Sequence, residues 1–190
     1  MWRYFLPAAL FLALGVVLGY TLKRIDHGKL DVREIESPLL GKPAPAFRLP
    51  ALADPAHTID SHDLAGKTYL FNVWGTWCGG CRDEHAALIA IARTSGVPIV
   101  GLDWKDDPAL AQQWLNELGN PYLTVASDAD GRVAIDWGVY GAPETFLVSA
   151  SGVVLAKHVG PLSEEVWRRK FVPKLGAAGA AGAPAAGAGS

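Results

Sequence analysis

The chain has 190 residues, of which half are hydrophobic, and its formal net charge is only −2. This composition is typical of a globular protein and excludes a largely disordered chain. No basic excess is available to neutralise phosphates, so the sequence predicts no nucleic-acid partner.

The N-terminal segment carries a long apolar run. Residues 5–22 contain no charge and lie between Arg3 and the pair Lys23-Arg24. About twenty apolar residues can span a bilayer, so we interpret 1–24 as an uncleaved membrane anchor. A cleaved signal peptide is the alternative. The flanking charges do not favour export of the C-terminal part. The side of the membrane on which it lies must therefore be inferred from the chemistry of the remaining chain.

Three further regions follow the anchor. Residues 25–40 are polar with scattered charge and are interpreted as a spacer. Residues 41–175 hold alternating strand-like and helix-like segments and are interpreted as the folded domain. Residues 176–190 contain only glycine, alanine, proline and serine, which predicts a flexible tail.

The first half of the domain shows a strand, a helix and a second strand. Residues 68–74 are apolar on both faces, as in a strand covered on both sides of a sheet. Residues 85–93 are rich in alanine and too long for a strand, and residues 97–104 are the next β-rich run.

Residues 106–120 carry both helix start and helix stop signals. Asp107 is a candidate N-cap, Pro108 suits the first turn, and Gly119 follows the end. Apolar residues at every fourth position predict the buried face of this helix: Leu110, Trp114 and Leu118.

The end of the domain reads as a hairpin and a helix. Residues 144–159 form two strand-like runs joined by a Ser-Ala-Ser-Gly turn. Residues 163–175 predict a helix capped by Ser163. The order of all these elements predicts an α/β sandwich around a small mixed sheet.

The two cysteines are the main chemical feature. Cys78 and Cys81 are the only cysteines in the chain. Between a strand and a helix, Cys78 falls at the helix start, where unpaired N–H groups stabilise a thiolate and lower its pKa. Cys81 lies one turn further, on the buried side, where it can attack a mixed disulfide formed by the more exposed Cys78. The spacing therefore favours a redox pair.

Other interpretations of the cysteines remain open. A zinc site also begins with such a pair, but it normally needs a second pair or two histidines, and His85 is the nearest candidate. A structural disulfide across four residues would constrain the unfolded chain little. Two inert thiols are the remaining alternative.

Two segments carry a family resemblance. The segment "FNVWGTWCGGC" resembles the active-site strand and loop of the thioredoxin superfamily. "WCGGCRDEH" (77–85) and "DGRVAIDWGVYGAPETFLV" (130–148) resemble the membrane-anchored thioredoxin-like proteins of cytochrome c maturation, the CcmG/DsbE family. The resemblance runs from 41 to 175 and implies a thioredoxin-like fold.

The resemblance implies a thiol:disulfide oxidoreductase that acts as a reductant in the periplasm, held by one helix in the bacterial inner membrane. Its clients would be the haem-binding cysteines of apocytochrome c or a partner thiol protein. A membrane electron-transfer protein would reduce it again. The Cys78–Cys81 disulfide would be the only redox group, with no metal and no other cofactor.

The resemblance also assigns roles to residues around the cysteines. Cys78 would attack, Cys81 would resolve, and a cis-proline at Pro143 would face them. These residues would support the active site: Trp77, Glu84, Pro143 and Glu144. The backbone of Ala142 would pair with an extended client, and the Glu144 carboxylate would lie close to the cysteines and raise the pKa of Cys78.

Two departures from the family pattern affect the chemistry. Gly79-Gly80 replaces dipeptides that commonly include proline, so the redox potential cannot be transferred. Asn72 stands where thioredoxin has a buried aspartate, so Glu84, Glu144 or a water must accept the proton of Cys81. The alternative functions are a general envelope thiol reductase of the TlpA or ResA kind, and a copper or zinc carrier that uses both cysteines and His85.

Overall fold

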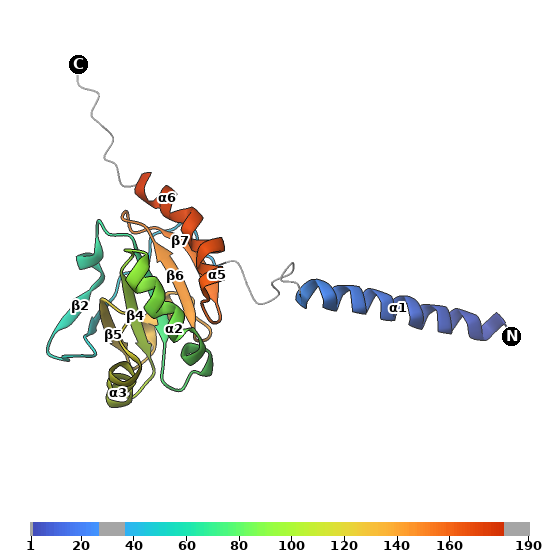
Figure 1. The fold of residues 1–190 in the computed structure, drawn as a ribbon, viewed down its shortest axis with the longest axis horizontal. Helices are drawn as coiled ribbons and strands as arrows, with labels where there is room; N and C mark the ends of the chain where they lie inside the picture. The colour runs from blue at the N-terminus through green and yellow to red at the C-terminus, as the bar shows by residue number, and fades with distance from the viewer. Residues whose placement is uncertain (1, 27–36, 181–190) are drawn as a thin grey trace, which may run out of the picture. The chain divides into compact units, whose positions relative to one another are not determined.

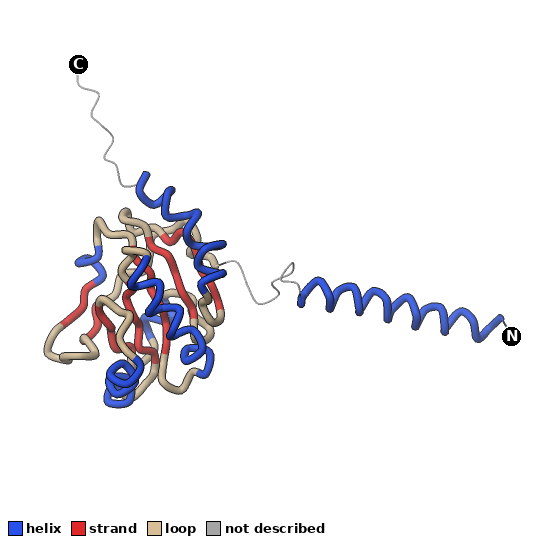
Figure 2. The backbone as a smooth tube through the Cα atoms, in the orientation of Figure 1, coloured by secondary structure: helices blue, strands red, loops and turns tan. Residues whose placement is uncertain are grey.

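The structure, a computed structural model, describes residues 2–26 and 37–180. The chain divides into two compact units, Met1–Ile35 and Glu36–Ser190, which are described separately. Figure 1 and Figure 2 show the elements of each unit.

The first unit contains one helix, α1 (Trp2–Asp26). Its exposed apolar side chains occur at consecutive positions and so on every side of the helix: Leu10, Phe11, Leu12, Leu14, Val16, Val17 and Leu18. Within the residues that the structure describes, no helix meets the length and hydropathy needed to cross a membrane. The predicted transmembrane helix is therefore not confirmed.

The second unit is built on a mixed five-stranded sheet with strand order β5-β4-β3-β6-β7. The strands are β3 (Tyr69–Trp74), β4 (Ile99–Trp104), β5 (Thr124–Asp128), β6 (Glu144–Val148) and β7 (Val154–Val159). The first three run parallel, whereas β6 is antiparallel to both β3 and β7. A separate antiparallel pair is formed by β1 (Arg48–Pro50) and β2 (Thr58–Asp60).

Helices cover both faces of this sheet. The helices are α2 (Gly79–Thr94), α3 (Pro108–Leu118), α4 (Arg132–Asp136), α5 (Glu164–Val166) and α6 (Val172–Ala180), with a 3-10 turn at Ser61–Leu64 and a π turn at Trp167–Phe171. Residues of α2, α3 and the π turn share one buried cluster with one face of the sheet. Residues of α4, the β1–β2 pair and the 3-10 turn fill a second cluster on the other face. The predicted central mixed sheet flanked by helices is confirmed.

The local helix and hairpin signals are confirmed. Asp107 caps α3, and its Oδ1 accepts a hydrogen bond from Ala109 N at 2.8 Å. Ser163 caps α5, and its Oγ accepts from Val166 N at 3.2 Å. β6 and β7 pair antiparallel around the expected turn.

The predicted buried face of α3 is only partly correct. Trp114 is buried, but Leu110 is 53% exposed and Leu118 is 40% exposed. The buried side chains are instead Ala111, Trp114 and Leu115. A step of four residues turns a helix by 40° more than one full turn, so a run of such steps drifts off the face that packs on the sheet.

The region boundaries differ slightly from those predicted. Ile25 and Asp26 of the predicted spacer end α1, residues 27–36 lie outside the described ranges, and 37–40 form a turn of the domain. Residues 176–180 of the predicted tail continue α6, while 181–190 also lie outside the described residues.

Candidate active site

The cysteine pair lies at the junction between the end of β3 and the first turn of α2. Cys78 is the N-cap of α2, and its Sγ accepts a hydrogen bond from Cys81 N at 3.1 Å. The two residues form a disulfide, with their Cα atoms 5.3 Å apart. Helix-terminal N–H groups point toward this position, so the Cys78 sulfur occupies the site that best stabilises an anion.

The two sulfurs are less accessible than the sequence suggested. Cys78 is 5% exposed and Cys81 is 3% exposed, so the expected greater exposure of Cys78 is small in the disulfide form. The accessible apolar group beside them is Trp77, which is 53% exposed. Its indole N–H donates to Trp104 O at 3.1 Å, and the two rings meet edge to face. The Trp77 side chain is thereby held in place at the surface.

Pro143 faces the loop between the cysteines. The Ala142–Pro143 peptide bond is cis, the geometry expected of this proline. A Cβ placed on Gly80 would lie 3.0 Å from Pro143 Cδ and 3.2 Å from Pro161 Cγ. The glycine therefore lets the two prolines approach the cysteine loop closely. Ala142 is half-buried next to Pro143 and packs against the buried cluster that contains both cysteines.

Glu84 lies one turn after Cys81 and is buried, at 1% exposure. Its Oε2 accepts from Leu162 N at 2.7 Å, and its Oε1 accepts from Asn72 Nδ2 at 2.9 Å. Burial raises the pKa of Glu84 to about 7, and the two hydrogen bonds offset part of that rise. Glu84 is therefore a buried carboxyl group and not a solvated side chain on the outer face of α2.

Asn72 connects Glu84 to the sheet. Its Nδ2 also donates to Thr145 Oγ1 at 3.0 Å, and its Oδ1 accepts from Tyr122 Oη at 2.9 Å. Burial raises the pKa of Tyr122 well above its usual range, so the hydroxyl stays a donor. All hydrogen bonds of this network use Asn72 as a neutral amide, and the only carboxylate in it is Glu84.

Glu144 does not join this network. Neighbouring strand residues point to opposite faces, and Thr145 points toward α2 because it contacts Asn72. Glu144 therefore points to the other face, where its Oε2 lies 2.8 Å from Lys157 Nζ. The expectation that its carboxylate lies beside the cysteine pair is wrong.

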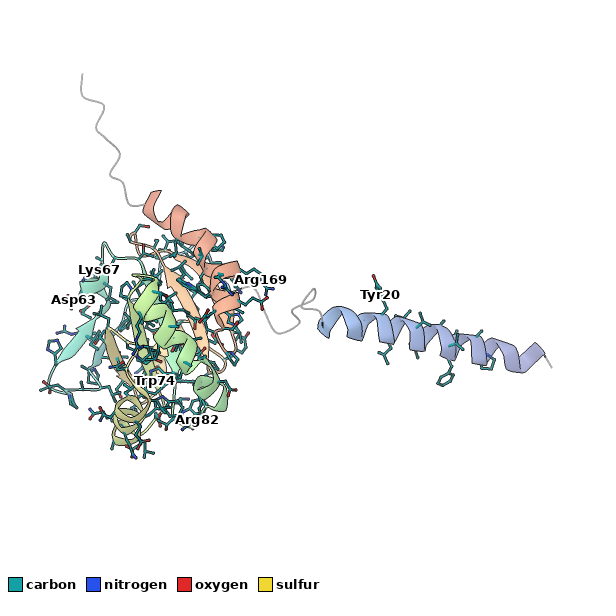
Figure 3. The ribbon with its side chains drawn as sticks, in the orientation of Figure 1. Tyr20, Asp63, Lys67, Trp74, Arg82 and Arg169 are labelled. Atoms are coloured by element: carbon teal, nitrogen blue, oxygen red, sulfur yellow. A yellow bond between two sulfur atoms is a disulfide. The ribbon has the colours of Figure 1, made fainter. Side chains whose placement is uncertain are left out.

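Two aspartates that the sequence did not single out lie at the same end of the sheet. Asp106 Oδ1 accepts from Thr76 Oγ1 at 2.7 Å, and Thr76 N donates to Oδ2, which ties the active-site loop to the start of α3. Asp103 is fully buried at the end of β4, and its register partner on β3 is Trp74. Figure 3 shows Trp74 and Arg82 at this end of the domain. Asp103 lies inside the β-rich run 97–104 and Asp106 follows it, and neither position carried a sequence signal for a role at the site.

The ring of His85 makes structural hydrogen bonds through both nitrogens. Trp114 Nε1 donates to His85 Nδ1 at 3.3 Å, so Nδ1 is an acceptor and Nε2 donates to Gly119 O at 2.9 Å. Among the residues in the described ranges, no three His, Cys, Asp or Glu side chains are grouped as metal ligands. Both ring nitrogens of His85 are used in hydrogen bonds, and Cys78 and Cys81 are joined to each other.

The sheet order, the cis-proline and the disulfide at a helix N-terminus define a thioredoxin-like thiol:disulfide oxidoreductase. Residues 39–172 match the Redoxin family. The thiol:disulfide interchange protein DsbE of Pseudomonas aeruginosa is 49% identical over 87% of this chain and 92% of that protein. DsbE of Allochromatium vinosum is 46% identical over 90% of this chain and 91% of its own length. The chain belongs to the Redoxin family and, within it, to the DsbE (CcmG) family.

A solved structure supports the fold. The thioredoxin-family thiol:disulfide interchange protein of Chlorobium tepidum is 26% identical, covers 67% of this chain and 91% of its own, and superposes with a TM-score of 0.57. The predicted thioredoxin-like fold and the oxidoreductase class are therefore confirmed.

Proposed function

We propose that this oxidoreductase is a reductant of cytochrome c maturation, whose client is apocytochrome c or a partner thiol protein. The Cys78 thiolate attacks one client sulfur, the client S–S bond breaks, and a client thiolate leaves. The Cys81 thiolate then attacks Cys78 Sγ and releases the second client thiolate. Two electrons pass to the client, and the Cys78–Cys81 disulfide is the oxidised product. A membrane electron-transfer protein returns the two electrons.

The observation that carries these roles is the position of Cys78 at the α2 N-cap. A thiolate is stabilised there and serves as the attacking group, whereas Cys81 lies inside the helix. Glu84 accepts the proton of Cys81, because it lies three residues further on the same buried side of α2. Trp77 and the backbone of Ala142 bind the client next to the sulfurs. Pro143 shapes that edge. The disulfide is the redox group, without a metal or another cofactor.

Trapping of mixed disulfides tests the assignment of the two cysteines. In Cys81→Ser the second attack is impossible, so client proteins should accumulate as disulfides with Cys78. Cys78→Ser, the matched control, should trap none. Non-reducing gels and mass spectrometry of the trapped species would identify the client. Equal trapping by both variants would refute the assigned roles, and trapping of many unrelated envelope proteins would favour a general reductase.

We further propose that residues 1–24 anchor the domain in the bacterial inner membrane with the domain in the periplasm. The proposal is supported by the uncharged run 5–22 and by apolar side chains on all sides of α1. A reporter that is active only in the periplasm, fused after Leu175, should be active. The purified protein should keep its first residues and fractionate with membranes. Activity of a cytoplasm-dependent reporter alone would refute this orientation.

A further inference from the structure

A buried ion pair lies behind the active site. Lys157 Nζ and Glu144 Oε2 are 2.8 Å apart, and the two side chains are 4% and 0% exposed. The pair joins β7 to the first residue of β6, directly after Pro143. In the β6–β7 register Lys157 is opposite Phe146, so it is the diagonal neighbour of Glu144 on one face.

The same two side chains hold the segment 138–143 that leads into β6. Lys157 Nζ donates to Gly138 O at 2.9 Å, and Glu144 Oε1 accepts from Tyr140 N at 3.1 Å. The ammonium also lies 4.8 Å from the centre of the Tyr140 ring, within reach of a cation–π contact. Each charged group therefore fixes one backbone position of the segment as well as its partner.

Stability alone gives a weak reason for such a pair. Burying two charges costs solvation that their attraction roughly offsets, and a well-packed apolar pair is often as stable. The charges do achieve something an apolar pair would not, because they supply one donor and one acceptor to the backbone of segment 138–143. That segment ends at Ala142 and Pro143, which lie beside the cysteine loop.

We propose that Lys157 and Glu144 are positioning residues that set the client-binding edge at Ala142. The inference rests on the proposed function, because it assumes that an extended client chain pairs with this edge. The pair lies on the face of the sheet opposite Asn72 and Glu84, so it acts through the backbone and leaves the chemistry of the sulfurs unchanged. Its loss weakens binding of a polypeptide client and spares the reaction with a small disulfide.

The experiment compares two oxidised substrates on the full-length chain, with a thiol reductant that returns two electrons to the Cys78–Cys81 disulfide in each turnover and whose direct reaction with each substrate is subtracted. One is a peptide of about ten residues that carries a Cys-x-x-Cys disulfide, and the other is hydroxyethyl disulfide, which has no chain to pair. Lys157→Met should raise KM for the peptide about tenfold or more, with kcat nearly unchanged. The rate with hydroxyethyl disulfide and the pKa of Cys78 should stay within about twofold and about 0.2 units of wild type. Lys157→Arg should restore much of the peptide KM, because it keeps the charge and a donor.

Two more variants separate positioning from misfolding. Glu144→Leu/Lys157→Met leaves no unpaired buried charge, should fold, and should show the same rise in peptide KM. Lys67→Met is the matched control and should behave as wild type. Lys67 is exposed, and in Figure 3 it lies well apart from Arg82, which follows Cys81 on α2 and so marks the active site.

The outcomes distinguish the inference from the function on which it rests. A wild-type peptide KM in the double variant would overturn the inference alone, and so would an equal loss with both substrates or a shifted pKa of Cys78. A wild-type protein that reduces neither substrate would refute both the proposed function and the inference.

Discussion

Glu84→Gln is expected to slow resolution of the mixed disulfide by Cys81 about 100-fold, the lower end of the usual contribution of a general base. Asn72 cannot accept the proton of Cys81, since it is a neutral amide already bonded to Tyr122, and Glu144 lies on the other face of the sheet. Of the two carboxylates that the sequence offered as acceptors, Glu84 is the one on the face of Asn72, and it is bonded to that amide. The attack by Cys78 should change less than about threefold, because the α2 N-terminus rather than Glu84 stabilises that thiolate.

The pH dependence of the resolution rate distinguishes a proton acceptor from a residue with a purely structural role. Burial raises the pKa of Glu84 to about 7, and only its deprotonated form accepts a proton. The resolution rate of the wild type should therefore rise with pH up to about 7 and level off above it. In Glu84→Gln the rise of the resolution rate with pH should vanish. Loss of a structural hydrogen bond to Asn72 would lower the rate without removing this rise. Rapid mixing of a preformed mixed disulfide at several pH values measures both features.

Glu117→Gln is the control for this experiment. Glu117 is exposed on α3 and bonds only to Gln113 among the contacts of the described residues, so its loss should leave the profile intact. An unchanged step near pH 7 in Glu84→Gln would show that another group accepts the proton.

Local sequence signals predicted the elements whose ends carry their own chemistry. The caps Asp107 and Ser163 and the turn between β6 and β7 use side chains and backbone angles of neighbouring residues, so a short window contains the information. β5 (Thr124–Asp128) was missed for the opposite reason. Its sequence includes Ala, Ser and Asp, which are not typical of strands, and its conformation depends on parallel pairing with β4.

The active site also combines features that neighbouring residues predict with features that depend on distant parts of the chain. The roles of the cysteines follow from a spacing of three residues at a strand–helix junction, and the family motif indicated the cis-proline. The face of Glu144 could not be read, because β6 is buried at every position and shows no apolar–polar alternation to set its phase. The burial of Glu84 depends on Leu162, which is 78 residues away, so no local pattern could indicate it.

Asp103→Asn is expected to stabilise the oxidised protein at pH 8 by more than about 2 kcal/mol, since each pKa unit is worth about 1.4 kcal/mol. Asp103 is fully buried, and within the described chain neither of its oxygens makes a hydrogen bond of normal geometry. Burial, followed by the negative charge of Asp106, raises its pKa to about 8. An amide has the same shape and never has to release a proton in this environment.

The sign of the pH dependence follows from proton uptake. Between about pH 4 and pH 8 the folded Asp103 keeps a proton that the unfolded chain has released, so the free energy of unfolding falls as pH rises through this window. Below pH 4 both states are protonated and the variant should match the wild type. The difference between them should then grow up to pH 8. Glu84 adds its own pH dependence to both proteins, so the difference isolates Asp103.

Urea unfolding of both oxidised proteins at pH 4, 6 and 8 measures this growing difference. Asp136→Asn, which removes an exposed aspartate of α4, should show no such trend. Equal or lower stability of Asp103→Asn at pH 8 would mean that the carboxylate is satisfied in the folded state. In that case a donor at the end of β4 would have to balance its charge. Trp74 is the register partner of Asp103 on β3, and its buried indole N–H has no hydrogen-bond partner within the described residues, so it is a donor available for this task.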